Sequence, residues 1–494
     1  MLKYLFMVIG LSLPNISSYS HGLDNLWMMG YASAASSNYG GTNFDFSSGT
    51  PNIYYVYRDQ NITTTNANIT DSLGQLLFCS NGVYISDASG DTMMNGSGLN
   101  PSAYTDTYYS NGLFIPQGDI IVPDPGSTSK YYLFHCTVDE ITTGGITLTH
   151  KLYYSSIDMT LNNGLGGVTS KNVELLNGDY IPGRLSAVRH GNGRDWWVVF
   201  HLYGFSYYAE FLVDTSGVQG PFYIGIGTNH YTATGQTTFS KQGDKFAWYD
   251  VNTDLDIFDF DRCTGAFSNL HHIDINDSAQ SGGVAFSPSG NFLYVSSGFY
   301  VYQYNLLSSN IDSSRVTVAV WDSTYSPNPP FAARFFLAQL APDNKIYINC
   351  PNSTMTMHVI NNPDSLGLAC DFCQHCISLP TFNAFTLPTP PNYHLGSLQG
   401  SICDTLLSIP EANNITFSIF PNPVSDKLNV SFNDNVEILS VKIYSLLGEL
   451  ILQENNIHVL GNAYIANTKK LNQGFYVCQF TLKSGTVSFK FLKE

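Results

Sequence analysis

The stretch Gly282–Leu306, GGVAFSPSGNFLYVSSGFYVYQYNL, indicates the fold of the larger part of the chain. It contains three short apolar runs, Val284–Phe286, Phe292–Ser296 and Tyr300–Asn305. The turn Ser287-Pro288-Ser289-Gly290 joins the first two runs, with Pro at its second position and Gly at its fourth, where β-turns favour them. Short strands joined by turns that contain Gly and Pro predict one blade of a β-propeller.

The blade pattern recurs along the chain. Val284–Val295 aligns with Leu337–Ile348, and the two segments lie about 50 residues apart, which is the period of propeller blades. Divergent copies precede them, so that six blades can be read from the sequence. We expect residues 376–400 and the N-terminal strands 26–57 to form a seventh and close the ring, because closure removes exposed sheet edges. The predicted fold is therefore all-β, with a propeller of seven blades.

The composition supports strands and turns rather than helices. Charged residues make up 12% of the chain, whereas about 25% is usual in soluble proteins. Tyr, Phe and Gly are abundant, and aromatic residues favour strands. The net charge of −17 argues against nucleic acid as a partner, because phosphate binding requires basic patches.

Residues 1–20 have the features of a secretory signal peptide. Lys3 supplies a positive charge, Leu5–Leu13 is apolar but too short to span a bilayer, and Ser18-Tyr19-Ser20 places small residues where a signal peptidase cleaves. The alternative is a buried first strand. No later segment is long and apolar enough for a transmembrane helix. We therefore expect cleavage near Ser20 and an exported mature protein.

A second domain is predicted at the C-terminus, after a polar linker at 406–416. Its segments alternate polar and apolar residues, as expected of a small Ig-like β-sandwich of about seven strands. Four motifs follow in a specific order: Phe417–Leu428, Val441–Glu449, Leu471–Val477 and Lys483–Thr486. Residues 417–494 thereby resemble the C-terminal sorting domain of type IX secretion cargo. The resemblance implies the type IX secretion machinery as a partner, and a secreted or outer-surface location that is reached through the periplasm.

The propeller region, residues 21–405, also carries a resemblance. The blade turns at 287–290 and 341–347, the segment Arg189–Trp197 and the ending Asn392–Gly396 are similar to those of secreted propellers of the Bacteroidetes. This resemblance implies the architecture and little of the chemistry.

Nine cysteines raise the question of disulfide bonds. The spacing Cys370-x-x-Cys373-x-x-Cys376 suits a zinc or iron–sulfur site, but no fourth ligand is evident and an exported protein meets an oxidising compartment. Disulfide chemistry is the favoured alternative, with Cys370, Cys373, Cys376 and Cys403 as the candidates. An odd number of cysteines leaves at least one unpaired.

Two further clusters are candidate ligand sites. Asp254 and Asp256 belong to an acidic run whose oxygens suit calcium, although the same residues fit turn caps and a solvated strand face. The segment that contains His190, Arg194, Asp195 and Trp196 suits a carbohydrate patch, in which an aromatic ring stacks on the ligand and polar groups orient it. The alternative, which we favour, places Trp196 in a core strand after a turn.

Two functions remain open for the propeller. It is a binding module for a glycan or a protein, as its polar, aromatic-rich loops and lack of a catalytic motif suggest, or it is an enzyme of the propeller lyase, hydrolase or lactonase kind. Carboxylates with shifted pKa or a bound metal cation at the channel mouth would favour the enzyme. A channel filled by apolar side chains would favour the binding module.

Overall fold

The computed structural model describes residues 22–33, 38–232, 234–328, 330–404, 417–432, 437–445, 450–455, 463–482 and 485–494. The chain divides into two compact units, of which the first ends at Cys403 and the second begins at Asp404. Within these described ranges, no helix has the length and apolar character that crossing a membrane requires.

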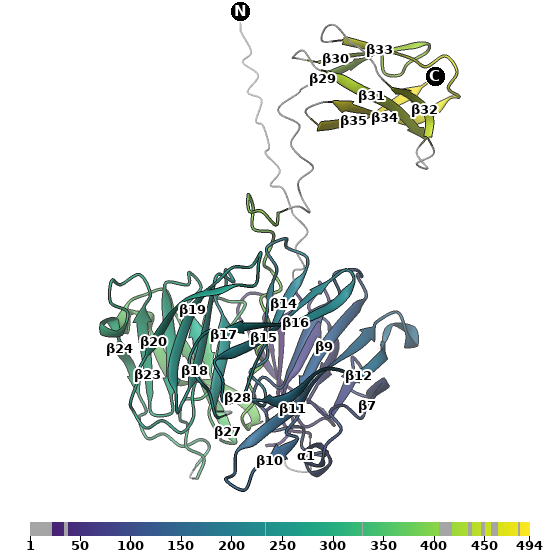
Figure 1. Ribbon diagram of the computed structural model, residues 1–494. Helices are drawn as coiled ribbons and strands as arrows, with labels where there is room; N and C mark the ends of the chain where they lie inside the picture. Colours follow the sequence, from purple (N-terminus) through teal and green to yellow (C-terminus); the bar gives the residue numbers. More distant parts are fainter. Residues whose placement is uncertain are drawn as a thin grey trace, which may run out of the picture. The chain divides into compact units, whose positions relative to one another are not determined.

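Four sheets of the first unit share one plan, in which four antiparallel strands follow one another in sequence order (Figure 1). The first two sheets comprise β13 Ser186–Arg189, β14 Trp196–His201, β15 Tyr207–Asp214, β16 Gly217–Gly225, β17 Gly235–Phe239, β18 Lys245–Asp250, β19 Asp254–Phe260 and β20 Phe267–Ile273. The next two comprise β21 Gly283–Phe286, β22 Phe292–Ser297, β23 Tyr300–Asn305, β24 Val316–Val320, β25 Ala338–Leu340, β26 Ile346–Ile348, β27 Thr354–Ile360 and β28 Phe372–Asn383. These sheets are consecutive propeller blades, as the repeat predicted.

Two further blades precede them and share one edge. The first comprises β4 Ala67–Thr70, β5 Leu76–Ser80, β6 Tyr84–Asp87 and β7 Thr92–Ser97, and the second β8 Asp119–Pro123, β9 Lys130–Cys136, β11 Thr147–Asp158 and β12 Gly167–Tyr180. A single parallel bridge between Met94 and Gly167 joins β7 to β12. The short strand β10 Glu140–Ile141 pairs with β11. The helices are short: α1 Ala103–Thr107, η1 Asn162–Gly164, η2 Asp312–Ser314 and η3 Gly367–Cys370.

The remaining sheet, at the N-terminal end, has three strands: β1 Leu26–Gly30, β2 Gly41–Asp45 and β3 Asn52–Val56. β1 runs antiparallel to β4. Two hydrogen bonds show this direction: the Asn66 amide donates to Met28 O, and the Asn68 amide donates to Leu26 O. In the other blades the innermost strand runs in the direction of β4. β1 therefore takes the second position of its blade and leaves the innermost position to another segment.

Residues 384–391, which we call the closing segment, run along the inner edge of this three-stranded sheet. Phe385 N donates to Thr63 O at one end, Leu387 packs in the cluster that contains Trp27 and Met29, and the residues around Pro390 lie against Leu26 and Trp27. The segment is not a paired strand, since its three prolines have no N–H to donate. The prediction that both ends of the unit close the ring is thus only partly right. Residues 376–383, which we assigned to this blade, belong to β28 of the preceding one.

Aromatic side chains fill the space between blades. The blades β13–β16 and β17–β20 share a buried cluster that includes Trp197, Tyr208, Phe246, Trp248 and Phe267. The rings of Tyr208 and Phe267 stack at 4.9 Å. This packing explains why the chain uses so many aromatic residues and so few charged ones, because each blade face is covered by its neighbour.

The second unit is a sandwich of two sheets, ordered β29-β30-β33 and β32-β31-β34-β35. In β34 the residues Tyr476, Cys478, Phe480 and Leu482 are buried and alternate with less buried ones, which is the period of a strand with one covered face. The described residues give seven strands, the number predicted: β29 Phe417–Phe420, β30 Lys427–Phe432, β31 Ile438–Ser445, β32 Leu450–Asn455, β33 Ala463–Asn467, β34 Gly474–Leu482 and β35 Gly485–Lys493.

Candidate ligand site at the mouth of the central channel

The central channel of the propeller has a cavity at each end. Residues that immediately precede the innermost strands surround a cavity of about 460 Å³, which we call the arginine mouth. It is lined by Thr64, Phe114, Pro116, Arg184, Thr234, Gly235, Gln280, Ser281, Arg334, Phe336, Pro351, Asn352 and Phe385. Six blades and the closing segment contribute to this lining, so that only the closed ring assembles it.

Arg184 is the buried cation of the arginine mouth, with only 2% of its surface exposed. Its Nη1 donates to Pro116 O at 3.0 Å. Its Nε and Nη2 are buried and have no hydrogen-bond partner among the described residues. One edge of the guanidinium therefore has no acceptor among the described residues.

Burial also shifts the protonation equilibrium of Arg184. Removal from water lowers the pKa of its guanidinium to about 10, and the more distant Asp250 and Cys136 oppose this shift only in part. No carboxylate of the described chain lies within ion-pair distance of Arg184. At neutral pH the group still carries its charge, and an unpaired buried charge is costly unless a partner arrives.

Arg334 is the second cation of the arginine mouth. Its guanidinium carbon lies 4.3 Å from the ring centroid of Phe299 and 5.1 Å from that of Trp321, so that two aromatic faces hold it. Its Nε is buried without a hydrogen-bond partner among the residues described. The half-buried rings of Phe114, Phe336 and Phe385 form the apolar part of the lining.

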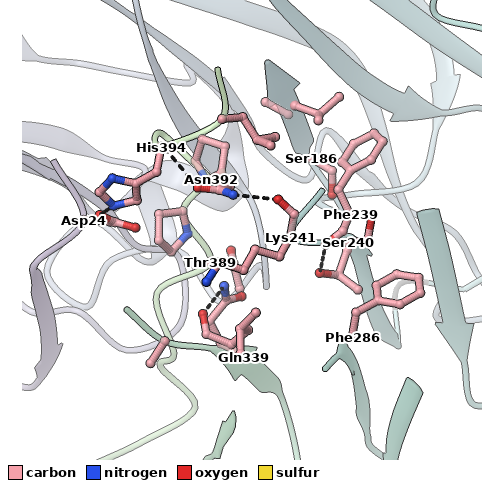
Figure 2. A pocket seen from close by; sticks show the side chains of 18 of the residues that line it. Asp24, Ser186, Phe239, Ser240, Lys241, Phe286, Gln339, Thr389, Asn392 and His394 are labelled. Atoms are coloured by element: carbon pink, nitrogen blue, oxygen red, sulfur yellow. Dashed lines mark hydrogen bonds and ion pairs between the residues drawn. The ribbon is translucent and has the colours of Figure 1, made fainter. Parts of the chain in front are cut away.

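The cavity at the opposite end of the channel is smaller, about 130 Å³. Figure 2 shows His394 beside Asp24 on one side of it and Phe239 and Phe286 on the other. The His394 Nε2–Asp24 Oδ1 distance is 2.8 Å, and this contact raises the pKa of the imidazole. The Asn392 amide donates to Lys241 O at 2.7 Å. Residues 389–395 thus line much of this end.

Between the two cavities, glutamine side chains cross the channel. The Gln117 amide donates to Thr237 O and accepts from Thr237 N, each at 2.9 Å. The Gln236 amide donates to Ala338 O at 2.7 Å and accepts from Ala338 N at 2.9 Å. Polar side chains that satisfy one another therefore lie between the arginine mouth and the smaller cavity.

The predicted carbohydrate patch is not a free surface. Trp196 is buried, and the Arg189 guanidinium lies 4.3 Å from its ring on one side. Arg194 Nε donates to Asp195 Oδ1 at 2.6 Å. His190 Nε2 lies 3.0 Å from Cys263 O. These side chains hold a turn against the neighbouring blade, and the Trp196 ring is not available for stacking on a ligand.

The predicted calcium ligands have other partners. Asp256 is buried, with Oδ1 2.7 Å from His272 Nδ1 and Oδ2 accepting from the Thr228 hydroxyl at 2.8 Å. Asp254 starts β19 in a left-handed backbone conformation, with φ of 60°. The described residues contain no group of three or more His, Cys, Asp or Glu that could hold a metal ion. Calcium at Asp254 and Asp256 thus stays a prediction without support from the geometry.

The cysteines pair differently from the prediction in two respects. Cys373 bonds to Cys376, but Cys403 bonds to Cys263, a partner that the sequence analysis did not name. Cys370, a predicted disulfide candidate, is a buried free thiol. The Cys263–Cys403 bond joins the end of the first unit to the turn after β19, across 140 residues of sequence. Spacing alone could not reveal a pair that the ring brings together.

Comparison with known proteins identifies the second unit. The family model of the secretion system C-terminal sorting domain matches residues 418–494. The chain ends in a secretion sorting domain. This sorting domain is characteristic of type IX secretion, so that the protein carries a signal for export. No match was found among curated proteins.

Solved structures similar to the chain are β-propellers. The Dos1 propeller has a TM-score of 0.37 and 12% identity and covers 67% of this chain and 91% of its own. The Cps50 (Swd1) propeller of Myceliophteria thermophila has a TM-score of 0.34 and 9% identity and covers 66% and 89%. Hsv2 of Kluyvelomyces marxianus has a TM-score of 0.35 and 8% identity and covers 65% and 84%. These likenesses concern the fold alone.

The sequence analysis missed Arg184 and Arg334. A usable signal was present in Tyr180–Ala187, YIPGRLSA, where a single cation follows Pro-Gly and precedes a strand that is buried on both faces.

Proposed function

We propose that the protein is an extracellular binding module that holds its ligand in the arginine mouth. The observation that carries the proposal is a buried guanidinium that lines a cavity large enough for a small ligand and has two donors without partners among the described residues. Ligand pockets commonly measure about 300–1,000 Å³, and this one measures about 460 Å³. A glycan end or a similarly small part of a larger partner would fit within it.

The same lining argues for binding rather than catalysis. The described residues around the arginine mouth include no His, Cys, Lys, Asp or Glu, and therefore no candidate general base. Asp119 and Glu210 have carboxyl pKa values raised to about 7 and about 8 by burial, but neither lines either cavity.

Export through the sorting domain supplies the location. We propose that the protein crosses the inner membrane by the signal at 1–20, which lies outside the described residues, and then passes the outer membrane to the cell surface or the medium. Deletion of 417–494 is expected to leave the protein in the periplasm. Surface exposure that is unchanged by this deletion would contradict the proposed route.

The binding proposal is tested with the purified protein and a panel of extracellular polysaccharides, with retention and product release read from the same samples. Retention without product, weakened by Phe336→Ala in the arginine mouth, is the expected result. Leu368→Ala, at an exposed position outside both cavities, is the matched control. Product release would support the enzyme alternative instead. Retention that Phe336→Ala leaves unchanged would place the ligand elsewhere on the propeller.

A further inference from the structure

We infer that Arg184 is the anchor for a carboxylate group, so that the arginine mouth selects small ligands that carry one. The inference rests on the proposed function and deepens it by naming the chemical class of the ligand. Three observations support it. Two donors of the guanidinium have no partner among the described residues, the backbone turn at Arg184 is held in place, and a second cation and aromatic rings lie nearby.

The free donors of Arg184 are the pair that binds a carboxylate side-on. Nη1 is engaged by Pro116 O, while Nε and Nη2 are buried without partners among the described residues. The N–H groups of Nε and Nη2 point in the same direction, and their spacing matches the two oxygens of one carboxylate. A hydroxyl group or an amide could satisfy only part of this fork and would leave the charge without a counter-ion.

The backbone holds the turn that carries Arg184 before any ligand binds. Arg184 has φ of 63° and follows Gly183 at 77°, so that two consecutive residues adopt the left-handed conformation. A side chain at Gly183 would overlap Pro116 O. Arg184 N also donates to Pro116 O at 3.3 Å, which ties the turn to the neighbouring blade. A non-glycine residue in this conformation is costly, and such strain commonly persists at ligand sites.

The surroundings favour one negative charge on a compact, partly apolar body. Arg334, held between Phe299 and Trp321, adds a second positive charge at the rim. Phe114, Phe336 and Phe385 offer ring faces to the non-polar part of a ligand. The described lining has no lysine, and the cavity is not built on the N-terminus of a helix, two features that phosphate sites commonly use. A uronic acid unit or an aromatic carboxylate has the required combination.

The test uses probe pairs that differ only in the carboxylate: glucuronate against glucose, and benzoate against benzyl alcohol. Binding to the full-length protein is measured by calorimetry. We expect the carboxylate member of at least one pair to bind and its uncharged partner to bind at least about tenfold more weakly. Arg184→Met should abolish this preference, and Arg184→Lys should weaken binding because it keeps the charge but loses the fork. Arg315→Met, at an exposed arginine that lines neither cavity, is the control.

Thermal unfolding separates a binding role of Arg184 from a structural one. If its unpaired charge is retained for a ligand, Arg184→Met should keep or raise the melting temperature of the free protein, because an apolar side chain replaces a buried unpaired cation. The inference is overturned if probes of both kinds bind equally, if inorganic phosphate binds more tightly than either carboxylate, if no probe binds, or if Arg184→Met binds carboxylates as the natural protein does. If neutral glycans are still retained in that case and Phe336→Ala weakens their retention, the proposed binding function stands and only the carboxylate inference fails.

Discussion

His135 makes the stability of the propeller depend on pH in a way that can be calculated. The ring is fully buried in β9, with Nδ1 2.8 Å from Asn100 Oδ1 and Nε2 2.9 Å from Ser155 Oγ. Asn100 directs its amide nitrogen to Gly82 O, and Ser155 Oγ accepts from Asn172 N. The network therefore suits a neutral imidazole that donates from Nδ1 and accepts at Nε2. Burial lowers the pKa of His135 to about 3.

The sign of the effect follows from this lowered pKa. Between the ordinary value of 6.5 and about 3, the unfolded chain binds a proton at this position and the native protein does not. The stability contribution of neutral His135 is complete above the ordinary pKa and is lost as the pH falls below it. Linkage gives a loss of about 2 kcal/mol for this single group between about pH 7 and about pH 5.

Urea unfolding followed by tryptophan fluorescence measures this loss. All five tryptophans lie before Cys403, so that the signal reports the propeller unit and not the sandwich. Natural protein and His135→Gln are unfolded at about pH 7 and about pH 5, and the stability lost by each is compared, which cancels the other titrating groups. The natural protein should lose about 2 kcal/mol more than the variant. Equal losses in the two proteins would refute the assignment of a buried neutral imidazole.

Three further predictions concern the same unit. Replacing Cys263 and Cys403 by Ser removes a crosslink across 140 residues and should lower the free energy of unfolding by roughly 2–5 kcal/mol, whereas an unchanged urea midpoint would contradict a structural role. Burial raises the pKa of Glu210 to about 8, so the native carboxyl binds a proton that the unfolded chain releases, and stability falls as the pH rises from the ordinary value of 4.5 towards 8. Glu210→Gln should therefore raise stability by about 3 kcal/mol near pH 7 and flatten this part of the pH profile, and a variant that still shows the decline would contradict the raised pKa. Gly183→Ala should cost about 1–3 kcal/mol through its left-handed backbone and should also weaken carboxylate binding, so that full stability and binding in this variant would argue against the turn as the support of Arg184.

The sequence by itself determined the architecture, because local patterns encode it. Runs such as Val284–Phe286 and Phe292–Ser296, joined by Pro- and Gly-containing turns, are strands in the structure, where β21 is paired with β22. The motifs after residue 417 indicated both the sandwich and the sorting domain, since alternation with a period of two and the order of motifs are properties of neighbouring residues. Secondary structure of this kind depends on a few adjacent side chains and can be read without knowing the ring.

Only the tertiary structure decided where chemistry could occur. The sequence left a ligand platform open for Trp196 beside the favoured core strand, and the structure places the residue in the core, because the preceding blade and Arg189 cover its ring. Cys403 pairs with Cys263, which no spacing rule connects. Arg184 gained significance only when six blades and the segment around Phe385 surrounded it and left Nε and Nη2 without partners in the described chain. A propeller builds its site from residues that lie one blade apart in sequence, so the burial and pairing of each depend on contacts that form only when the ring has closed.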